Sequence, residues 1–148
     1  MQKCTLALGC FWKPEENFKD KPGILKTEVG YAGGDSPNIT YKEVCNGDTG
    51  HAEVVNLTFD EQIITYEKIL DLFFKMHDPT QKNMQYPDVG TQYRSEIFYE
   101  TKEQKNIAIM YREKLNKLYD NKIETNISKI KNYCRAEEYH QRYLEKNK

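Results

Sequence analysis

Apolar positions recur along this chain with two different spacings, and each spacing predicts one type of secondary structure. Short apolar or alternating runs bounded by turn residues predict strands, whereas apolar residues three or four positions apart predict amphipathic helices. Strands are expected over residues 3–8, 24–29, 51–59, 95–99 and 123–130. Helices are expected over residues 12–20, 66–77 and 136–144, together with a long helix that begins after Thr101.

Local signals mark the starts of two of these helices. Thr65 is an N-cap residue for the second helix, and Ile64 and Ile69 have the spacing of a hydrophobic staple. Residues 101–104 (Thr-Lys-Glu-Gln) have the pattern of a capping box. The helix that follows is expected to present on one face Ile107, Tyr111, Leu115 and Leu118.

The predicted order of elements is β-α-β-β-α-β-α-β-α, and its first six elements match the split β-α-β pattern. This order predicts an α+β fold. We expect a two-layer sandwich with a ferredoxin-like core, helices on one side of a mixed or antiparallel sheet, and a C-terminal helix. The irregular stretches over residues 30–50 and 78–93 are long for such a fold, and long loops are commonly functional. The length of 148 residues predicts a single catalytic domain over residues 1–148.

Charge and composition argue against several classes of protein. The 22 basic and 23 acidic residues nearly cancel, and glutamates are interspersed among the basic residues of the C-terminal third, so no nucleic-acid partner is expected. No apolar run reaches the ~18 residues of a membrane span, and the N-terminus lacks a signal-peptide pattern. The four cysteines form neither a C-x-x-C pair nor a zinc-spaced group with histidine, so no metal is expected. We expect a cytoplasmic protein with reduced cysteines, of which one or two at most are reactive.

Cys10 stands where an apolar strand ends and a helix begins. Pro14 fits only the first turn of a helix, because proline has no N–H to donate, so Cys10 lies at or just before the helix N-terminus. The helix dipole and the unpaired N–H groups favour an anion there and are expected to lower the pKa of the thiol. Phe11 and Trp12 follow at once and are expected to line an apolar pocket. The competing interpretation is that these three residues are ordinary core residues.

Further candidates lie where the two long loops run into strands. Glu53 lies early in an apolar strand, where burial is expected to raise the pKa of its carboxyl and make it a general acid near neutral pH. Tyr41 and Tyr93 end loops just before strands, and Asp88 lies in the second loop. Each of these four residues, taken alone, also fits a structural role. Two histidines are candidate bases, namely His51 and His77.

Six blocks of sequence, in order along nearly the whole chain, carry a family resemblance. They are G-C-F-W at 9–12, V-G-Y-A-G-G at 29–34, G-H-A-E-V-V at 50–55, H-D-P-T at 77–80, D-V-G-T-Q-Y-R-S at 88–95 and A-E-E-Y-H-Q at 136–141. One block alone would be weak evidence, but six in order are specific. In these blocks the chain resembles the A-type peptide methionine sulfoxide reductases.

The resemblance implies a role for each candidate residue. Cys10 would be the nucleophile that attacks the sulfoxide sulfur and becomes a sulfenic acid. Glu53 would protonate the sulfoxide oxygen, which is otherwise a poor leaving group. Tyr41 and Tyr93 would hydrogen-bond that oxygen, and Asp88 would support the site from behind.

The implied substrate is the S-epimer of methionine sulfoxide, free or in proteins, and Phe11 and Trp12 would hold its methyl group. Lys13 stands where the family often has glycine, which adds charge beside the pocket. No bound cofactor is implied, and reducing equivalents would come from glutathione, a glutaredoxin or a thioredoxin-type protein. Many members resolve the sulfenic acid with cysteines in a C-terminal tail, but no cysteine follows Cys134 in this sequence. An external thiol is therefore expected, with Cys134 as a possible internal one, and Cys45 is expected to be buried.

Two other classes of function stay open at this point. A thiol acyl-transfer enzyme would use Cys10 as nucleophile and His51 as base, and it would turn over esters without a reductant. No obvious third group orients that pair. A non-catalytic binding module would have a Cys10 of ordinary reactivity toward alkylating reagents.

Overall fold

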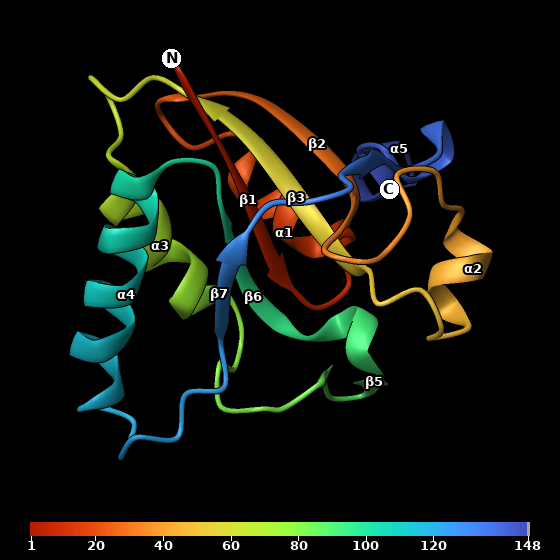
Figure 1. Ribbon diagram of the computed structural model, residues 1–148. Coiled ribbons are helices and arrows are strands. Elements are labelled where there is room, and N and C mark those ends of the chain that lie inside the picture. The colour runs from red at the N-terminus through yellow and green to blue at the C-terminus, as the bar shows by residue number, and fades with distance from the viewer. Residues whose placement is uncertain (148) are drawn as a thin grey trace.

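The computed structural model of the chain describes residues 1–147 and contains a six-stranded sheet in the order β7-β6-β1-β3-β2-β8 (Figure 1). Its strands are β1 (Gln2–Leu8), β2 (Ile24–Ala32), β3 (Ala52–Phe59), β6 (Ser95–Tyr99), β7 (Asn126–Lys129) and β8 (Cys134–Arg135). The helices are α1 (Trp12–Phe18), α2 (Tyr41–Cys45), α3 (Tyr66–Met76), α4 (Lys102–Asn116) and α5 (Tyr143–Lys146). A small hairpin and two 3-10 turns complete the elements: β4 (Met84–Gln85), β5 (Asp88–Val89), η1 (Thr91–Tyr93) and η2 (Glu138–His140). None of the helices in this part of the chain has the length and apolar character needed to cross a membrane.

The sheet order confirms the ferredoxin-like core. β6, β1, β3 and β2 are antiparallel neighbours, with α1 between β1 and β2 and α3 between β3 and β6. β7 is parallel to β6, which makes the whole sheet mixed, and α4 supplies the crossover that a parallel neighbour requires. In Figure 1, α3 and α4 lie on one side of the molecule, and α2 and α5 lie on the other.

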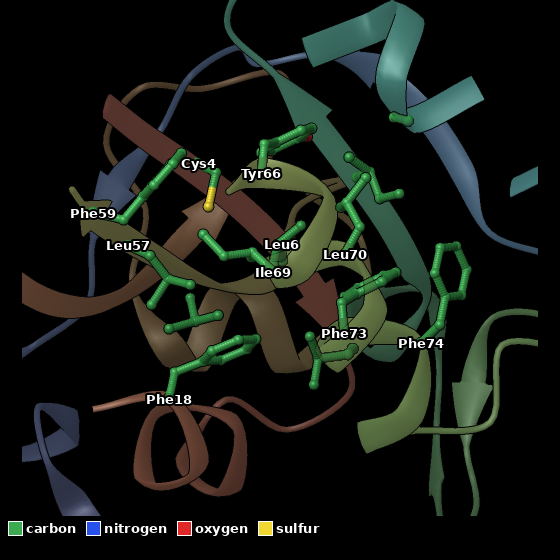
Figure 2. Packing of buried hydrophobic residues seen from close by; sticks show 14 of the residues in the cluster. Cys4, Leu6, Phe18, Leu57, Phe59, Tyr66, Ile69, Leu70, Phe73 and Phe74 are labelled. Carbon is green, nitrogen blue, oxygen red and sulfur yellow. The ribbon is translucent and has the colours of Figure 1, made fainter. Parts of the chain in front are cut away.

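The main core lies between one face of the sheet and the helices α1, α3 and α4. Cys4, Leu6 and Leu8 of β1 face this core, because alternate side chains of a strand point to the same face. Figure 2 shows Phe18 of α1 and Phe73 of α3 reaching the same cluster. The other face of the sheet carries a smaller core made of Ala7, Ala32, Ala52, Val54 and Phe98.

Threonine N-caps position three of the helices, α2, α3 and α4. Thr65 caps α3 as predicted, and the two staple residues, Ile64 and Ile69, are both buried in the main core. Thr40 caps α2 in a complete capping box with Glu43. α2 lies in a stretch that was expected to be a loop, although the Thr-x-x-Glu spacing of its capping box is a sequence signal for a helix start.

The start of α4 follows the predicted pattern only in part. The Thr101 side chain accepts from the N–H of Gln104 (3.1 Å). The Gln104 side chain, however, accepts from the N–H of Glu100 (3.0 Å) and donates to the carbonyl of Lys3 (2.9 Å) instead of closing the capping box. The expectation for Leu118 was wrong, because α4 ends at residue 116 and this side chain is 76% exposed.

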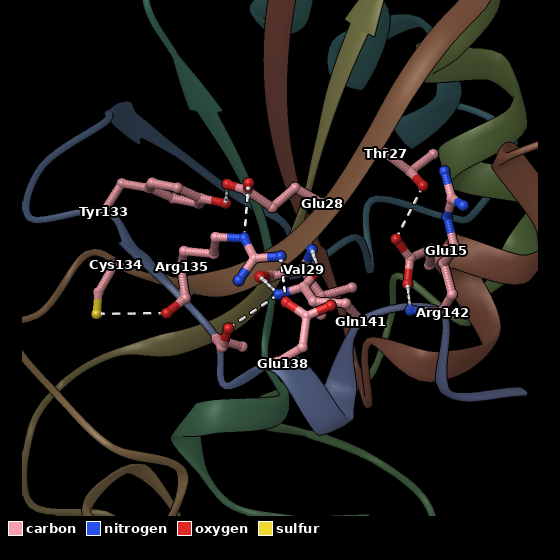
Figure 3. A network of polar contacts seen from close by, with 11 residues as sticks. Glu15, Thr27, Glu28, Val29, Tyr133, Cys134, Arg135, Glu138, Gln141 and Arg142 are labelled. Atoms are coloured by element: carbon pink, nitrogen blue, oxygen red, sulfur yellow. Dashed lines mark hydrogen bonds and ion pairs between the residues drawn. The ribbon is translucent and has the colours of Figure 1, made fainter. Parts of the chain in front are cut away.

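The C-terminal segment is not the helix predicted over residues 136–144. It runs instead through β8, η2 and α5. The side chain of Gln141 bonds both the N–H and the carbonyl of Val29 in β2 (3.0 and 2.9 Å), as Figure 3 shows. Arg142 has a left-handed φ of 52°, and its N–H donates to the buried carboxylate of Glu15 in α1 (2.6 Å). Bonds to β2 and α1 therefore outweigh the local helix propensity of this segment.

Candidate active site

Cys10 lies in the tight connection between β1 and α1. The preceding Gly9 has φ +95°, and a Cβ there would meet the side chain of Gln85 at 3.0 Å. Glycine is therefore needed both for the turn and for the close approach of the β4–β5 hairpin. Cys10 is partly exposed and lines a cavity of about 420 Å³. The cavity is also lined by Lys13, Asn17, His77, Tyr86 and Asp88.

Glu53 supplies a buried carboxyl beside the thiol. It lies on β3 opposite Tyr31 of β2, and it is 1% exposed. Its Oε1 accepts from the N–H of Phe11 (3.3 Å), the residue after Cys10, whereas its buried Oε2 has no partner among the described residues. Burial raises the pKa of Glu53 to about 8 against the opposing effect of the Phe11 N–H, and the charge of Asp88 also raises it. The carboxyl therefore holds a proton at neutral pH, as a general acid must.

The thiol of Cys10 differs from the expectation of a lowered pKa. Burial raises the pKa of Cys10 to about 12. The N–H of Trp12 at the start of α1 lowers this pKa, in the direction expected at a helix N-terminus, but α1 has only seven residues and desolvation dominates. Asp88 and the ionised form of Glu53 also raise it through their negative charge. The resting thiol is therefore protonated and must lose its proton as it reacts.

Two tyrosines and an aspartate surround Glu53. Tyr41 opens α2 and Tyr93 ends η1, so each long loop supplies one hydroxyl. Burial raises the pKa of both tyrosine hydroxyls above the usual range. At Tyr41 a hydrogen bond with the Cys45 thiol raises the pKa further. The ionised form of Glu53 raises the pKa of both tyrosines as well. Asp88 places negative charge beside Glu53 and Tyr93. The structure thus brings together five of the predicted residues, namely Cys10, Glu53, Tyr41, Tyr93 and Asp88.

The two rings that follow Cys10 differ in exposure. Phe11 is 1% exposed and packs in a small core behind the site. Trp12 is partly exposed, its ring stacks on Tyr143 with centroids 3.8 Å apart, and its indole N–H donates to Nδ1 of His140 (3.0 Å). Trp12 has surface left for a ligand, whereas Phe11 is mainly a core residue.

Arg94 ties the second long loop to the start of β3. Its Nε donates to the carboxylate of Glu96 (2.6 Å). Its other guanidinium nitrogens donate to the carbonyls of Thr91 (2.9 Å) and Gly50 (3.0 Å). These bonds hold η1, which carries one of the site tyrosines, against the strand that carries the buried carboxyl.

The two candidate histidines are engaged in structural bonds. His51 is 1% exposed, and its Nε2 lies 3.2 Å from the carbonyl of Asn132, away from the cavity. His77 lines the cavity, but its Nδ1 bonds the carbonyl of Phe73 and its Nε2 bonds the hydroxyl of Ser95, each at 2.7 Å. Burial lowers the pKa of His77 to about 4. Neither ring is a free base beside the thiol.

The two remaining cysteines of interest lie in different places. Cys134 lies on β8 and is paired with Tyr31 of the neighbouring β2. Its Sγ lies 3.6 Å from the carbonyl oxygen of Ile39. β8 is three strands away from β1, a distance of roughly 14 Å at the usual strand spacing. Cys45 was expected to be buried, and that expectation was wrong: it is exposed at the end of α2, where its thiol bonds the Tyr41 hydroxyl.

The residues that hold Tyr41 and Trp12 in place were not among the predicted site residues. One carboxylate oxygen of Glu137 accepts from the hydroxyl of Tyr31 (2.8 Å), and the other accepts from the N–H of Tyr41 (2.9 Å). His140 accepts the indole N–H of Trp12. Both residues belong to the A-E-E-Y-H-Q block, which was visible in the sequence but was assigned to a helix.

Known proteins resemble this chain in sequence and in structure. The model of a family described as peptide methionine sulfoxide reductase matches residues 2–148. Peptide methionine sulfoxide reductase MsrA of Pelagibacter ubique is 59% identical over 146 residues, which cover 99% of this chain and 99% of that protein. Among solved structures, Mxr1 from Saccharomyces cerevisiae in reduced form has a TM-score of 0.92 and 42% identity, covering 99% of this chain and 85% of that one. Mxr1 in complex with Trx2 has a TM-score of 0.66 and 27% identity, covering 89% of this chain and 78% of that one.

Proposed function

The chain belongs to the peptide methionine sulfoxide reductase family and reduces methionine sulfoxide to methionine, and from this premise we propose how its own residues carry the reaction. Residues 1–148 act as one catalytic domain. The substrate is the S-epimer of methionine sulfoxide, free or in proteins. Cys10 is the nucleophile, and Glu53 is the general acid.

The first steps transfer the oxygen away from the substrate sulfur. Sγ of Cys10 gives up its proton and attacks the sulfoxide sulfur, so that an S–S bond forms while Glu53 protonates the oxygen. The oxygen leaves as water with the protons of Glu53 and Cys10. Water then attacks Sγ, and the S–S bond breaks with both of its electrons going to the substrate sulfur. Glu53 takes back a proton from the attacking water. Methionine has gained two electrons, and Cys10 has lost two and become a sulfenic acid.

The tyrosines and the aspartate act on the oxygen and on its acid. Tyr41 and Tyr93 donate hydrogen bonds to the sulfoxide oxygen, and these bonds strengthen as negative charge develops on it. Burial raises the pKa of Glu53 and the charge of Asp88 adds to this effect, so that the acid is protonated when the substrate binds. The loss of either tyrosine is therefore expected to slow the chemical step.

One observation carries this proposal: Oε2 of Glu53 is buried beside Cys10 and has no partner among the described residues. A buried polar atom without a partner is costly, and it is expected where a ligand supplies the missing bond. The test is to incubate the protein with each methionine sulfoxide epimer and dithiothreitol and to quantify methionine. Methionine from the S-epimer alone supports the proposal. Ester turnover without any reductant would instead favour acyl transfer by Cys10 and His51, against which the burial of His51 argues.

Replacing Trp12 by alanine is expected to reduce discrimination between methionine sulfoxide and its ethyl analogue. The indole would no longer hold the substrate methyl group, a contact worth roughly 1–3 kcal/mol in selectivity. The measurement is kcat/KM for both sulfoxides. Phe11→Ala is expected to act in the same direction, with a stability loss of about 3–5 kcal/mol because that ring is buried. Unchanged selectivity in both variants would make these rings core residues only.

We propose that an external thiol resolves the Cys10 sulfenic acid. The attacking thiol forms a mixed disulfide with Cys10 and releases water, and a second thiol then regenerates Cys10. A thioredoxin-type protein is the favoured reductant, supported by the complex of the yeast relative Mxr1 with Trx2. Glutathione or a glutaredoxin is the alternative. Such reductants fit a reducing compartment, and we propose the cytoplasm.

Reduced protein given one equivalent of substrate, with no reductant, is expected to lose one thiol, which dimedone traps at Cys10. The position of Cys134 supports this expectation, because a disulfide needs Cα atoms within about 7 Å and β8 lies three strands from β1. The measurement is thiol counting followed by peptide mapping. Loss of two thiols with a Cys10–Cys134 or Cys10–Cys45 crosslink would replace the external route by an internal one.

A further inference from the structure

The proposed chemistry leaves one part of the site without a role, namely the C-terminal segment that packs behind it. Within this segment His140 is 1% exposed and lies against three rings of the site. Its ring centroid is 5.2 Å from that of Phe11, 5.7 Å from that of Trp12 and 4.4 Å from that of Tyr41. His140 therefore packs against Phe11 and Trp12, the two proposed rings of the methyl pocket, and against Tyr41, which is proposed to bind the sulfoxide oxygen.

The bond between Trp12 and His140 determines the protonation state of the imidazole. An indole N–H can only donate, so Nδ1 of His140 must accept and carry no proton (3.0 Å). The ring is therefore neutral, with its proton on Nε2, which is buried without a partner among the described residues. If the ring of His140 took up a second proton at Nδ1, this N–H would face the indole N–H of Trp12, and the hydrogen bond between the two residues would be lost.

The segment is held to the rest of the site by its polar side chains. Glu137 bonds the N–H of Tyr41 and the hydroxyl of Tyr31, and Gln141 bonds the backbone of Val29 in β2 (Figure 3). The segment thus has fixed contacts with α2 and β2 on either side of His140. It has the rigid support that a side chain needs in order to orient its neighbours.

We propose that His140 is a positioning residue for sulfoxide reduction: as a neutral imidazole it holds the Trp12 indole, and packs against Tyr41, in the arrangement that receives the substrate. The inference rests on the proposed function, because Trp12 and Tyr41 contact substrate only there. The groups that face the imidazole are the rings of Phe11, Trp12, Tyr41 and Tyr139 and the carboxylate of Glu137.

Trp12 is the single tryptophan of the chain, so its emission reports on this contact directly. His140→Leu removes the acceptor, whereas the Oδ1 of His140→Asn reaches the position of Nδ1 and retains it. We expect His140→Leu to shift Trp12 emission, to lower kcat/KM by up to about 10²-fold through misplaced substrate contacts, and to lose discrimination between methyl and ethyl sulfoxides. We expect His140→Asn to restore most of each property.

Acidification supplies a second readout that needs no variant. Burial lowers the pKa of His140 against the opposing charge of Glu137, so the emission of wild-type Trp12 is expected to change below the usual histidine pKa of about 6.5. The same transition should be absent in His140→Asn. His51→Asn is the matched control, because His51 is also 1% exposed but lies away from Trp12. It should lower the unfolding temperature without moving the emission or the selectivity.

Several outcomes would overturn the inference. The inference fails if folded His140→Leu has the same Trp12 emission and the same kcat/KM as the wild type. It also fails if His140→Asn is as defective as His140→Leu. An acid transition that persists in His140→Asn would contradict the neutral-imidazole requirement. Failure of the proposed function appears separately, as sulfoxide reduction that survives Cys10→Ser, and the emission readout does not depend on it.

Discussion

Cys10→Ser is expected to abolish reduction of methionine sulfoxide while the fold stays intact. A serine hydroxyl is a much weaker nucleophile toward sulfur than a thiol, and it cannot form the sulfenic acid that ends the reaction. Cys10 lies in the β1–α1 connection, outside the buried clusters of the sheet, so the substitution removes little packing. Methionine formed from the S-epimer in the presence of dithiothreitol measures the loss.

The matched control is Cys134→Ser, the same chemical change on β8. With dithiothreitol as the reductant this variant is expected to retain reduction, because the external thiol resolves Cys10. Thermal unfolding of both variants checks that each is folded. A Cys10→Ser variant that reduces the sulfoxide at a rate comparable to the wild type would show that the nucleophile is another residue.

Glu53→Gln is expected to slow reduction by about 10²–10⁴-fold at neutral pH, the usual range for general acid catalysis. The amide keeps the shape of the carboxyl but has no proton of the required acidity. The measurement is kcat/KM for the S-epimer as a function of pH. A loss smaller than about threefold, well under the range for an acid catalyst, would return Glu53 to a structural role.

The pH dependence of this loss has a definite sign. The pKa of Glu53 is raised to about 8, so the wild type holds the catalytic proton at neutral pH. At acid pH the solvent supplies protons to the variant, and the ratio of the wild-type rate to the Gln rate is expected to fall. Above about pH 8 the ratio is expected to fall again, because Glu53 loses its proton.

Stability gives an independent check on the same carboxyl. Its folded pKa of about 8 lies above the unfolded value of about 4.3, so folding is favoured by the protonated form. The contribution of Glu53 to stability is fully present below about pH 4.3 and is lost as the pH rises to about 8. Glu53→Gln lacks this titration. The unfolding temperature of the variant should therefore rise relative to that of the wild type over this interval.

Local sequence patterns were sufficient for five of the six strands of the sheet and for most helices, and they made Cys10 and Glu53 candidates for the site, but they did not predict β8. The apolar run in β1, the alternation in β3 and the cap at Thr65 depend on neighbours a few positions away, and the two strands and the cap all appear in the structure. The strand-to-helix break at Cys10 and the carboxyl of Glu53 in an apolar strand were recognisable for the same reason. The capping box at Thr40 was equally local, and it could have predicted α2.

The tertiary structure decided the electrostatics of the site and the course of the C-terminal segment. Desolvation raises the pKa of Cys10 far above the value expected from its helix position, and desolvation depends on what the fold packs around the thiol. Gln141 and Glu137 bond β2 and α2, and these partners are distant in sequence, so helix propensity alone gave the wrong structure there. The same bonds bring His140 against Trp12. Caps and periodicity act over a few neighbouring residues, so they were enough to place most of the elements and to make Cys10 and Glu53 candidates for the site. The protonation states of these candidates, and the side chains that support them, depend on burial and on hydrogen bonds between residues far apart in the chain.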